Sequence, residues 1–376
     1  MKQLAAFCES KRGWLLETIE ALARLESPST DKVAVDLCGL ELARRLRAIG
    51  GRVTLIPEAA AGDHVLADFG SSGPRTLLLG HFDTVWPIGT LDRMPVRAAD
   101  GRLWGPGVFD MKSGIGLAML AVEALAASGA LPRIGVLLTT DEETGSVTSR
   151  QLIEAEARNS RAVLVLEPAL PGGALKTSRA GCGAFEIEVR GRAAHAGIEP
   201  ARGANALLEL AEQMLSVERL QDLERGTSLT VTLAVGGTRA NVVPAGARAT
   251  VDARAFGAQE AERVSAAMTA LRARRPGTTV TVSGGFTHPP LERTPDGVRL
   301  FEMARAVASE LGHSLSEGRT GGGSDGNFTA AAGVPTLDGL GSVGDGAHAP
   351  HEHVVIDALP FRAALLAGLL TRLGNV

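Results

Sequence analysis

Apolar and polar residues alternate along the chain in blocks that predict a layered α/β protein. Apolar positions at helical spacing predict a helix over residues 4–25 and a second over 31–49, with Thr30 or Asp31 as its N-cap. Short apolar runs bounded by turn-forming residues predict strands, with helical patterns between them. The predicted strands are 53–56, 64–69, 76–79, 134–140 and 162–166; a polar loop covers 81–107, and further helices cover 111–127 and 149–157. Such alternation is typical of an α/β domain.

The pattern changes after Pro171-Gly172-Gly173. From residue 185 the predicted order is strand, helix, strand, strand, helix, strand, over 185–190, 203–216, 228–235, 247–254, 258–273 and 278–283. This βαββαβ order is that of a split ferredoxin-like unit. The first pattern then resumes, with helices over 298–311 and 356–373, a Gly-rich loop over 318–326 and a strand over 334–337. We therefore expect one α/β domain in two segments, 1–175 and 290–376, interrupted by an α+β domain over 176–289.

Composition and charge exclude several classes of function. Of the 376 residues, 45% are hydrophobic and 21% charged, and the net charge of −4, without any Lys/Arg-rich run, argues against a nucleic-acid partner. The three cysteines are far apart, which argues against a disulfide framework and a cysteine zinc site. We find neither an apolar run long enough to span a membrane nor a signal peptide, so we expect a cytoplasmic protein. Catalysis by tyrosine is excluded, because the chain has none.

Side chains with useful chemistry stand next to several predicted elements. In α/β sheets, ligands bind outside the carboxyl ends of the strands. The candidates at such positions are His81 with Asp83, Asp110, Glu142 with Glu143, Glu167, and His348. All of these except the pair Glu142 and Glu143 have an ordinary structural alternative. These alternatives are a polar loop for His81 and Asp83, a helix N-cap for Asp110 and a surface strand end for Glu167. His348 alone is a weak signal, and Glu352 with the neighbouring His351 and His353 could form a solvated face.

The combination of these side chains favours a metal centre. The adjacent carboxylates Glu142 and Glu143 raise each other's pKa, a cost that a cation removes and a general base exploits. Asp83, two residues from His81 in an extended segment, can orient the imidazole for a metal. Nitrogen and oxygen ligands without cysteine suit zinc, with manganese or cobalt as substitutes. An even division gives each of two ions one histidine and one carboxylate, with one further carboxylate shared.

Seven motifs in order along the chain are those of a known family. They are His81-x-Asp83, Gly107 to Gly114, Asp141 to Ser146, Glu167-Pro168, His195-Ala196-Gly197, Asn241 to Pro244, and Arg319 to Asp325. By these motifs the chain resembles the dizinc metallopeptidase and amidohydrolase family of glutamate carboxypeptidases, aminoacylases, acetylornithine deacetylases and succinyl-diaminopimelate desuccinylases. It is most similar to the glutamate carboxypeptidase branch, and the resemblance covers nearly the whole chain.

The resemblance implies a mixed-sheet zinc-peptidase catalytic domain, with the inserted ferredoxin-like domain as a lid and as the interface of a homodimer. It implies two Zn²⁺ ions bridged by Asp110, with His81 and Glu167 at the first and Glu143 and His348 at the second. Glu142 would be the general base and Asp83 the carboxylate that orients His81, a division that the spacing of the two glutamates leaves open. The peptide bond from Asp110 to Met111 would be cis.

The resemblance also implies contacts from the inserted domain. His195 would stabilise the oxyanion, in this family often in the partner's active site, and Asn241 would contact the substrate. An arginine that commonly precedes the Pro-Pro pair at the end of this domain is replaced here by His288, which lacks the permanent bidentate fork of arginine. His288 either contacts substrate or packs at a domain hinge. Arg319 and the backbone N–H groups around Gly323 and Ser324 are the other predicted anion binders; the alternative for this loop is a flexible turn.

Three hypotheses follow for the function. The first is a metal-dependent hydrolase that cleaves an amide next to a free carboxylate in a small peptide, as a glutamate carboxypeptidase does. The second is a deacetylase or desuccinylase of N-acyl amino acids, which the histidine at position 288 keeps open. The third is a non-catalytic binding protein on the same fold. It would require a damaged ligand set, yet none of the five ligand positions or Glu142 is substituted.

Overall fold

The structure, a computed structural model, describes residues 1–374 and divides the chain into two units. Unit 1 comprises Met1–Thr177, Arg293–Arg319 and the chain from Ser324 onward. Unit 2 comprises Ser178–Glu292 and Thr320–Gly323. The chain passes between the units four times. Two of these boundaries lie in the paired strands β8 (Leu175–Arg179) and β13 (Glu317–Thr320), and the other two follow Glu292 and Gly323. Neither strand is predicted from the sequence, in which most of β13 falls within the expected Gly-rich loop and β8 has no assignment.

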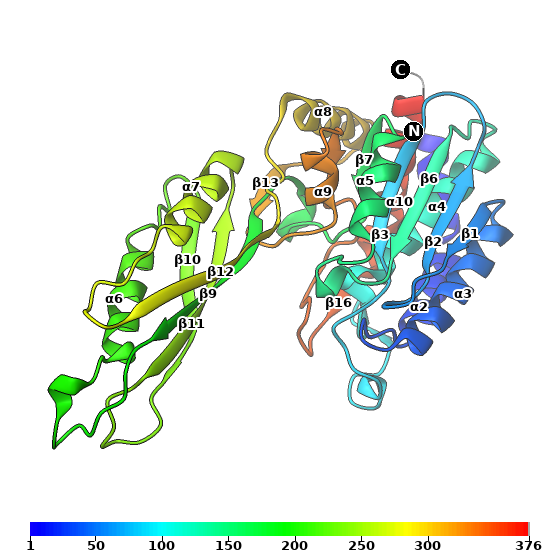
Figure 1. Ribbon diagram of the computed structural model, residues 1–376. Coiled ribbons are helices and arrows are strands. Elements are labelled where there is room, and N and C mark those ends of the chain that lie inside the picture. The colour runs from blue at the N-terminus through cyan, green and yellow to red at the C-terminus, as the bar shows by residue number, and fades with distance from the viewer. Residues whose placement is uncertain (375–376) are drawn as a thin grey trace. The chain divides into compact units, whose positions relative to one another are not determined.

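A mixed six-stranded sheet forms the centre of unit 1 (Figure 1). Four neighbouring strands are parallel, and two antiparallel strands complete one edge. In spatial order they are β1 (Arg52–Ile56), β2 (His64–Phe69), β6 (Ile134–Thr139), β3 (Thr76–His81), β7 (Ala162–Val165) and β14 (Thr336–Leu337). The predicted α/β class with a mixed sheet is thus confirmed.

Helices cover both faces of this sheet because its strands are apolar on both sides. Leu78 of β3 packs into the larger core, whereas its neighbours Leu77 and Leu79 pack into a second core on the opposite face. The larger core includes residues of α1 (Lys2–Ser10), α2 (Arg12–Ala23), α3 (Lys32–Ala48), α4 (Ser113–Ala127), α8 (Pro295–Glu310) and α10 (Leu359–Gly374). The second core includes residues of α5 (Arg150–Arg158) and α9 (Gly326–Ala331).

Local details differ from the prediction at two places, and a third place decides between two predicted N-caps. The single helix expected over 4–25 is broken at Lys11, which has non-helical backbone angles and separates α1 from α2. Asp31, one of the two candidates, is the N-cap of α3, where its side chain accepts the N–H of Ala34 at 3.1 Å. The Gly-rich loop expected over 318–326 is shorter, because β13 occupies its start and α9 begins at Gly326.

The loop expected over 81–107 contains two strands. β4 (Arg97–Ala99) and β5 (Arg102–Trp104) form a small antiparallel sheet with β15 (Gly344–Asp345) and β16 (His353–Val355). β5 pairs with β16, in a register that sets Trp104 opposite His353. The prediction missed this sheet because strands of two or three residues carry no periodicity of their own; their partners are distant in sequence.

Unit 2 has the six elements predicted from the sequence, in the predicted order. They are β9 (Gly181–Arg190), α6 (Ala206–Glu218), β10 (Thr227–Gly236), β11 (Gly246–Ala255), α7 (Ala258–Thr269) and β12 (Thr279–His288). The strands form an antiparallel sheet in the order β10-β11-β9-β12. Both helices lie on one face of it, over alternate strand residues such as Phe185 and Ile187 (Figure 1).

The chain from residue 1 to residue 374 contains no helix that is both long enough and apolar enough to cross a lipid bilayer.

Candidate metal centre

The ends of three parallel strands bring four of the predicted side chains to one edge of the central sheet. His81 is the last residue of β3, and Glu142 and Glu143 begin the short 3-10 turn that follows β6. Glu167 lies two residues beyond the end of β7. Because β6, β3 and β7 are parallel neighbours, their carboxyl ends meet at the same edge.

Asp110 reaches the same edge from an irregular segment before α4. Its backbone angles (φ −114°, ψ 95°) are not helical, and the peptide bond from Asp110 to Met111 is cis, as the resemblance implied. Gly114, in the first turn of α4, allows the helix to approach the sheet closely. A Cβ atom at this position would lie 2.1 Å from the carbonyl oxygen of Leu166, next to Glu167. Only glycine permits this approach.

Asp110 belongs to two separate groups of potential metal ligands. The first group is His81, Asp110 and Glu167, and the second is Asp110, Glu143 and His348. His81 Nε2 lies 3.3 Å from Asp110 Oδ1 and 3.3 Å from Glu167 Oε1. His348 Nε2 lies 3.3 Å from Asp110 Oδ2 and 3.1 Å from Glu143 Oε2. Each oxygen of one carboxylate therefore faces a different histidine.

His348 comes from the loop between β15 and β16, and its backbone is unusual. Its φ of 60° is in the left-handed region, which residues other than glycine seldom adopt. Such conformations cluster at functional sites. In the absence of a cation, hydrogen bonds to Asp110 and Glu143 raise the pKa of His348 to about 10. The carboxylates thus attract positive charge strongly.

The attraction between carboxylates and imidazoles also shifts the pKa values of His81 and Asp110. Burial opposes a charged imidazole at His81, but hydrogen bonds that it donates to Asp110, Asp83 and Glu167 raise its pKa well above the usual value. Burial alone would raise the pKa of Asp110, yet His348 and His81 lower it well below its usual range. The raised pKa of His81 and the lowered pKa of Asp110 both show that positive charge among these carboxylates is stabilising.

Asp83 contacts both the ring of His81 and the turn after β6 that carries Glu143. The Nδ1 atom of His81 lies 3.1 Å from the backbone oxygen of Asp83 and 3.3 Å from its Oδ1. Oδ2 of the same carboxylate accepts the hydroxyl of Ser29 at 2.6 Å and the N–H of Glu143 at 3.2 Å. With Nδ1 engaged in this way, Nε2 is the atom that His81 offers to the ligand group.

Glu142 lies beside the cluster but belongs to neither ligand group. Its Oε2 is 3.9 Å from His81 Nε2. Burial raises the pKa of Glu142 well above the usual value; His81 opposes this rise, whereas the carboxylates of Glu167, Asp325 and Glu143 add to it. A raised pKa suits a carboxylate that accepts and returns a proton near neutral pH.

The donor set fits a pair of divalent cations. It supplies two imidazoles and three carboxylates, and it contains no thiol. Oε1 of Glu143 is buried and has no hydrogen-bond partner, although Oε2 of the same carboxylate faces His348. A buried carboxylate oxygen without a partner is costly, and a cation would remove the cost. Nitrogen and oxygen ligands of this kind suit zinc, cobalt or manganese.

Unit 2 carries His195 and Asn241 on adjacent segments, and both residues are exposed. Nδ1 of His195 accepts the backbone N–H groups of Gly197 and Ile198 at 3.1 and 3.2 Å. A neutral imidazole that accepts at Nδ1 carries its proton on Nε2. His195 therefore presents an N–H donor from an exposed loop. The backbone oxygen of Asn241 accepts the N–H of Ala196, which ties the two segments together.

His288 shares a row with an arginine that the sequence did not suggest. Cys182 of β9 is opposite His288 of β12 and also opposite Arg254 of β11. Directly paired residues of neighbouring strands lie on the same face of a sheet. The Arg254 guanidinium contacts Cys182 Sγ at 2.7 Å and forms a bidentate pair with Asp252. No motif identified Arg254, because the pairing register alone places it in the row of His288, on the other side of β9.

The remaining predicted substrate contacts divide into exposed and buried groups. Arg319 is exposed and Gly323 half-buried, with the Gly323 carbonyl accepting Arg179 Nη1 at 2.7 Å. Ser324 is fully buried. Its hydroxyl donates to Asp338 at 2.7 Å, and its N–H donates to Asn327 at 3.0 Å. These bonds engage both donors of Ser324 within unit 1.

Glu352 is a buried residue that the sequence suggested only as part of a solvated face. That suggestion is wrong for Glu352, which is fully buried, and for His353, which is 7% exposed; His351 is exposed. Burial raises the pKa of Glu352 to about 7, although hydrogen bonds from Asp110, Gly107, Trp86 and Phe109 oppose the rise. Nothing in the sequence indicated that Glu352 is buried, because its hydrogen-bond donors are distant from it in the chain.

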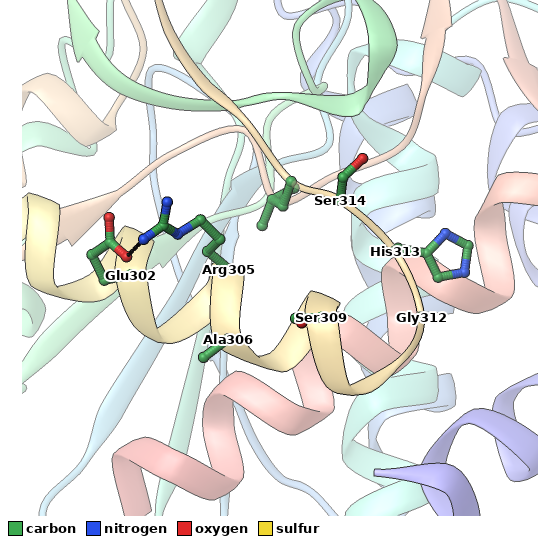
Figure 2. Close-up of a pocket in the computed structure, with 8 residues that line it drawn as sticks. Glu302, Arg305, Ala306, Ser309, Gly312, His313 and Ser314 are labelled. Carbon is green, nitrogen blue, oxygen red and sulfur yellow. Dashed lines mark ion pairs between the residues drawn. The ribbon is translucent and has the colours of Figure 1, made fainter.

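A cavity of about 640 Å³ at the end of α8 has no part in the cluster. Figure 2 shows Glu302 and Arg305, which form an ion pair at 2.5 Å, on one side of it and His313 on the other. The His313 ring stacks on Phe361 at 3.9 Å. The only charged pair that lines this cavity is therefore satisfied, and none of the predicted site residues lies there.

Comparisons with known proteins agree with the geometry. Residues 77–372 match the family described as peptidase family M20/M25/M40. The chain is 32% identical over 373 residues to carboxypeptidase G2 of Pseudomonas sp. (strain RS-16), covering 96% of this chain and 89% of that protein. It is 30% identical over 360 residues to succinyl-diaminopimelate desuccinylase of Xanthomonas euvesicatoria pv. vesicatoria (strain 85-10), covering 89% and 93%.

Solved structures show the same fold. Aminopeptidase PepT of Bacillus cereus ATCC 10987 matches with a TM-score of 0.85 at 21% identity, over 96% of this chain and 98% of that one. The YXEP protein of Bacillus subtilis, described as a dinuclear metal-binding peptidase, matches with a TM-score of 0.70 at 16% identity, over 98% and 99%. With the family match over most of its length, the chain belongs to peptidase family M20/M25/M40 and is a hydrolase of the metallopeptidase class.

Proposed function

We propose that the protein is a dizinc amidohydrolase that cleaves an amide bond next to a free carboxylate, as a glutamate carboxypeptidase does. The observation that carries this proposal is the sharing of Asp110 by two ligand groups, one with His81 and one with His348. Similarity to carboxypeptidase G2 along 96% of the chain supports the choice of bond. Cobalt or manganese could replace zinc in the same ligands.

In this proposal, His81, Asp110 and Glu167 would hold one ion and Asp110, Glu143 and His348 the other. The description of a family neighbour as dinuclear supports two ions. When bound, such ions polarise a carbonyl and lower the pKa of a water molecule. The chain supplies the proton transfer. Glu142, outside both groups and with a raised pKa, accepts the water proton and returns it to the leaving amine nitrogen.

We assign His195 to stabilisation of the oxyanion in the active site of a partner subunit. Its Nε2–H donor and its exposed loop support this role.

A homodimer through unit 2 is supported by β10, which is an edge strand of its sheet. Exposed apolar side chains on β10 and α6 would be covered in such a dimer; they are Leu233, Val235, Leu207, Leu208 and Leu215. Dimers in which one surface pairs with its own copy are the commonest homo-oligomers. A cytoplasmic location also stays a prediction.

The substrate is a small peptide or an N-acyl amino acid. We assign Asn241, Arg319, His288 and the backbone of Gly323 to binding of its carboxylate. The fifth predicted contact, Ser324, is left out of this assignment, because its hydroxyl and its N–H already donate to Asp338 and Asn327. Arg254, in the same row as His288, adds a guanidinium near the position where the glutamate carboxypeptidase branch has an arginine. Because Asp252 already pairs with Arg254, the match to a C-terminal glutamate is weaker. This observation favours a second candidate function, the removal of acetyl or succinyl groups from N-acyl amino acids.

A substrate panel tests the proposed function. The zinc-loaded protein should hydrolyse at least one substrate with a free carboxylate beside the scissile amide, among dipeptides and folate-like compounds with a C-terminal glutamate and N-acetyl and N-succinyl amino acids. Relative kcat/KM identifies the substrate class: a higher value for glutamate-terminated substrates favours the first function, and a higher value for acyl substrates the second. A protein that binds no metal and is inactive on the whole panel after zinc loading would refute both.

Subunit mixing tests the assignment of His195. Neither His195→Ala nor Glu142→Ala homodimers should be active. Mixed protomers should recover up to roughly a quarter of wild-type activity, because half of the dimers in a random mixture are heterodimers, each with one intact site. The measurement is activity after subunit exchange, with exchange followed by a mass tag on one variant. Complete exchange without recovery would contradict action in the partner's site.

A further inference from the structure

The carboxylate of Glu352 is surrounded by hydrogen-bond donors. Oε1 accepts the backbone N–H of Phe109 at 2.9 Å and that of Asp110 at 3.1 Å. Oε2 accepts the backbone N–H of Gly107 at 2.9 Å and the indole N–H of Trp86 at 2.8 Å. All four partners donate, so both oxygens must act as acceptors, as they do in an ionised carboxylate. Charge-assisted bonds of this kind are the stronger class of hydrogen bond.

Three of these bonds hold the segment that carries Asp110. Gly107 has a φ of 71°, and the angles of Asp110 and Met111 are not helical, so the segment lacks a regular helical ladder. The position of the shared carboxylate therefore depends on external partners for the N–H groups of Gly107, Phe109 and Asp110. Glu352 supplies a partner for each of them.

The backbone of Glu352 holds the turn that carries His348. The N–H of Glu352 donates to the carbonyl of Ala349 at 3.0 Å, which closes the turn just after His348. The carbonyl of Glu352 accepts the N–H of Gly105 at 3.3 Å, at the start of the Asp110 segment. One residue thus connects the segments of two ligands that are distant in sequence.

We propose that Glu352 is a positioning residue that sets the separation of Asp110 and His348, and thereby the affinity of the second ligand group for its metal ion. The inference rests on the metal centre proposed above. The first group depends less on Glu352, because His81 and Glu167 are positioned by β3 and β7. The second group takes two of its three ligands from the segments that Glu352 joins. The effect should therefore be greater for the second ion than for the first.

Glu352→Gln in the full chain tests the proposal. Glutamine has the same size, but its NH₂ group cannot accept the N–H donors that face one of the two oxygens. Loss of a residue that orients metal ligands typically weakens metal binding about 10–100-fold. We expect a loss of this size for one of the two ions in titrations of metal-free protein with Zn²⁺ against a competing chelator. Higher zinc concentrations should restore both the bound ion and the activity.

Glu209→Gln is the matched control. Glu209 in α6 is also fully buried, and it accepts the N–H groups of Arg274 and Arg275, the amide of Gln213 and the hydroxyl of Thr278. None of these residues is a candidate ligand. This variant should lose stability to a similar extent but bind both ions with wild-type affinity. If Glu352→Gln also binds both ions with wild-type affinity, Glu352 serves the fold alone and the proposal is overturned.

Two further outcomes are decisive. If wild-type protein binds fewer than two zinc ions, the proposed metal centre fails, and this inference fails with it. If Glu352→Gln does not fold, Trp86→Phe removes one donor from Oε2 and leaves the other three. A weaker second site in Trp86→Phe, with the first unchanged, supports the proposal, and unchanged affinity at both sites overturns it.

Discussion

Glu142→Gln should lower kcat about 10²–10⁴-fold, the usual contribution of a general acid–base group, while both metal ions stay bound. Glutamine keeps the size of the side chain but cannot take a proton from water. Metal binding should persist because Glu142 belongs to neither ligand group. The measurements are kcat on the best substrate of the panel, and metal content by atomic absorption.

The adjacent residue is the control for this prediction. Glu143→Gln should lose the second ion, because Glu143 stands in the group with His348. The two variants thus separate proton transfer from metal binding at neighbouring positions. A Glu142→Gln enzyme with wild-type kcat would place the base elsewhere, and one that loses an ion would make Glu142 a ligand.

Replacing Asp110 with alanine should abolish tight binding of both ions and reduce hydrolysis to background. Its two oxygens face different histidines, each at 3.3 Å, so both groups lose a ligand at once. Metal binding to the folded state stabilises a protein by about 4 kcal/mol for each site when the free ion is about 1,000 times above Kd. Zinc should therefore raise the Tm of metal-free wild-type protein but not that of Asp110→Ala.

Single-group variants make this prediction specific. His81→Ala should lose the first ion and His348→Ala the second, each retaining the other with weaker affinity. Metal content after dialysis distinguishes these cases. An Asp110→Ala protein that keeps one tightly bound ion would show that the carboxylate is not shared.

Much of the fold could be predicted because its signals are local. The apolar runs that become β2, β3, β6 and β7 are clear in the sequence, and so is the βαββαβ order of unit 2. The short strands β4, β5, β15 and β16 were missed, since two or three residues carry no periodicity and are stabilised by partners elsewhere in the chain. The break at Lys11 was missed because apolar spacing continues across it.

Part of the candidate site could likewise be predicted from local signals, and part could not. His81, Glu142, Glu143 and Glu167 could be assigned to one edge because each follows a strand, and parallel strands end together. The choice between Glu142 and Glu143 could not be made from spacing. In the structure, Glu143 is grouped with Asp110 and His348, whereas Glu142 stands outside both groups. This choice depends on how the turn after β6 directs two adjacent side chains.

The sequence by itself determined the class of the fold, the inserted α+β unit and the residue types of a candidate nitrogen–oxygen metal centre. Local hydrophobic patterns determine which face of an element is buried and where each strand ends. Only the tertiary structure decided that the two oxygens of Asp110 face different histidines, that Arg254 lies in the row of His288, and that Glu352 is buried against the Asp110 segment. These contacts join residues far apart in the chain, and a local pattern carries no information about which distant partner a side chain will meet.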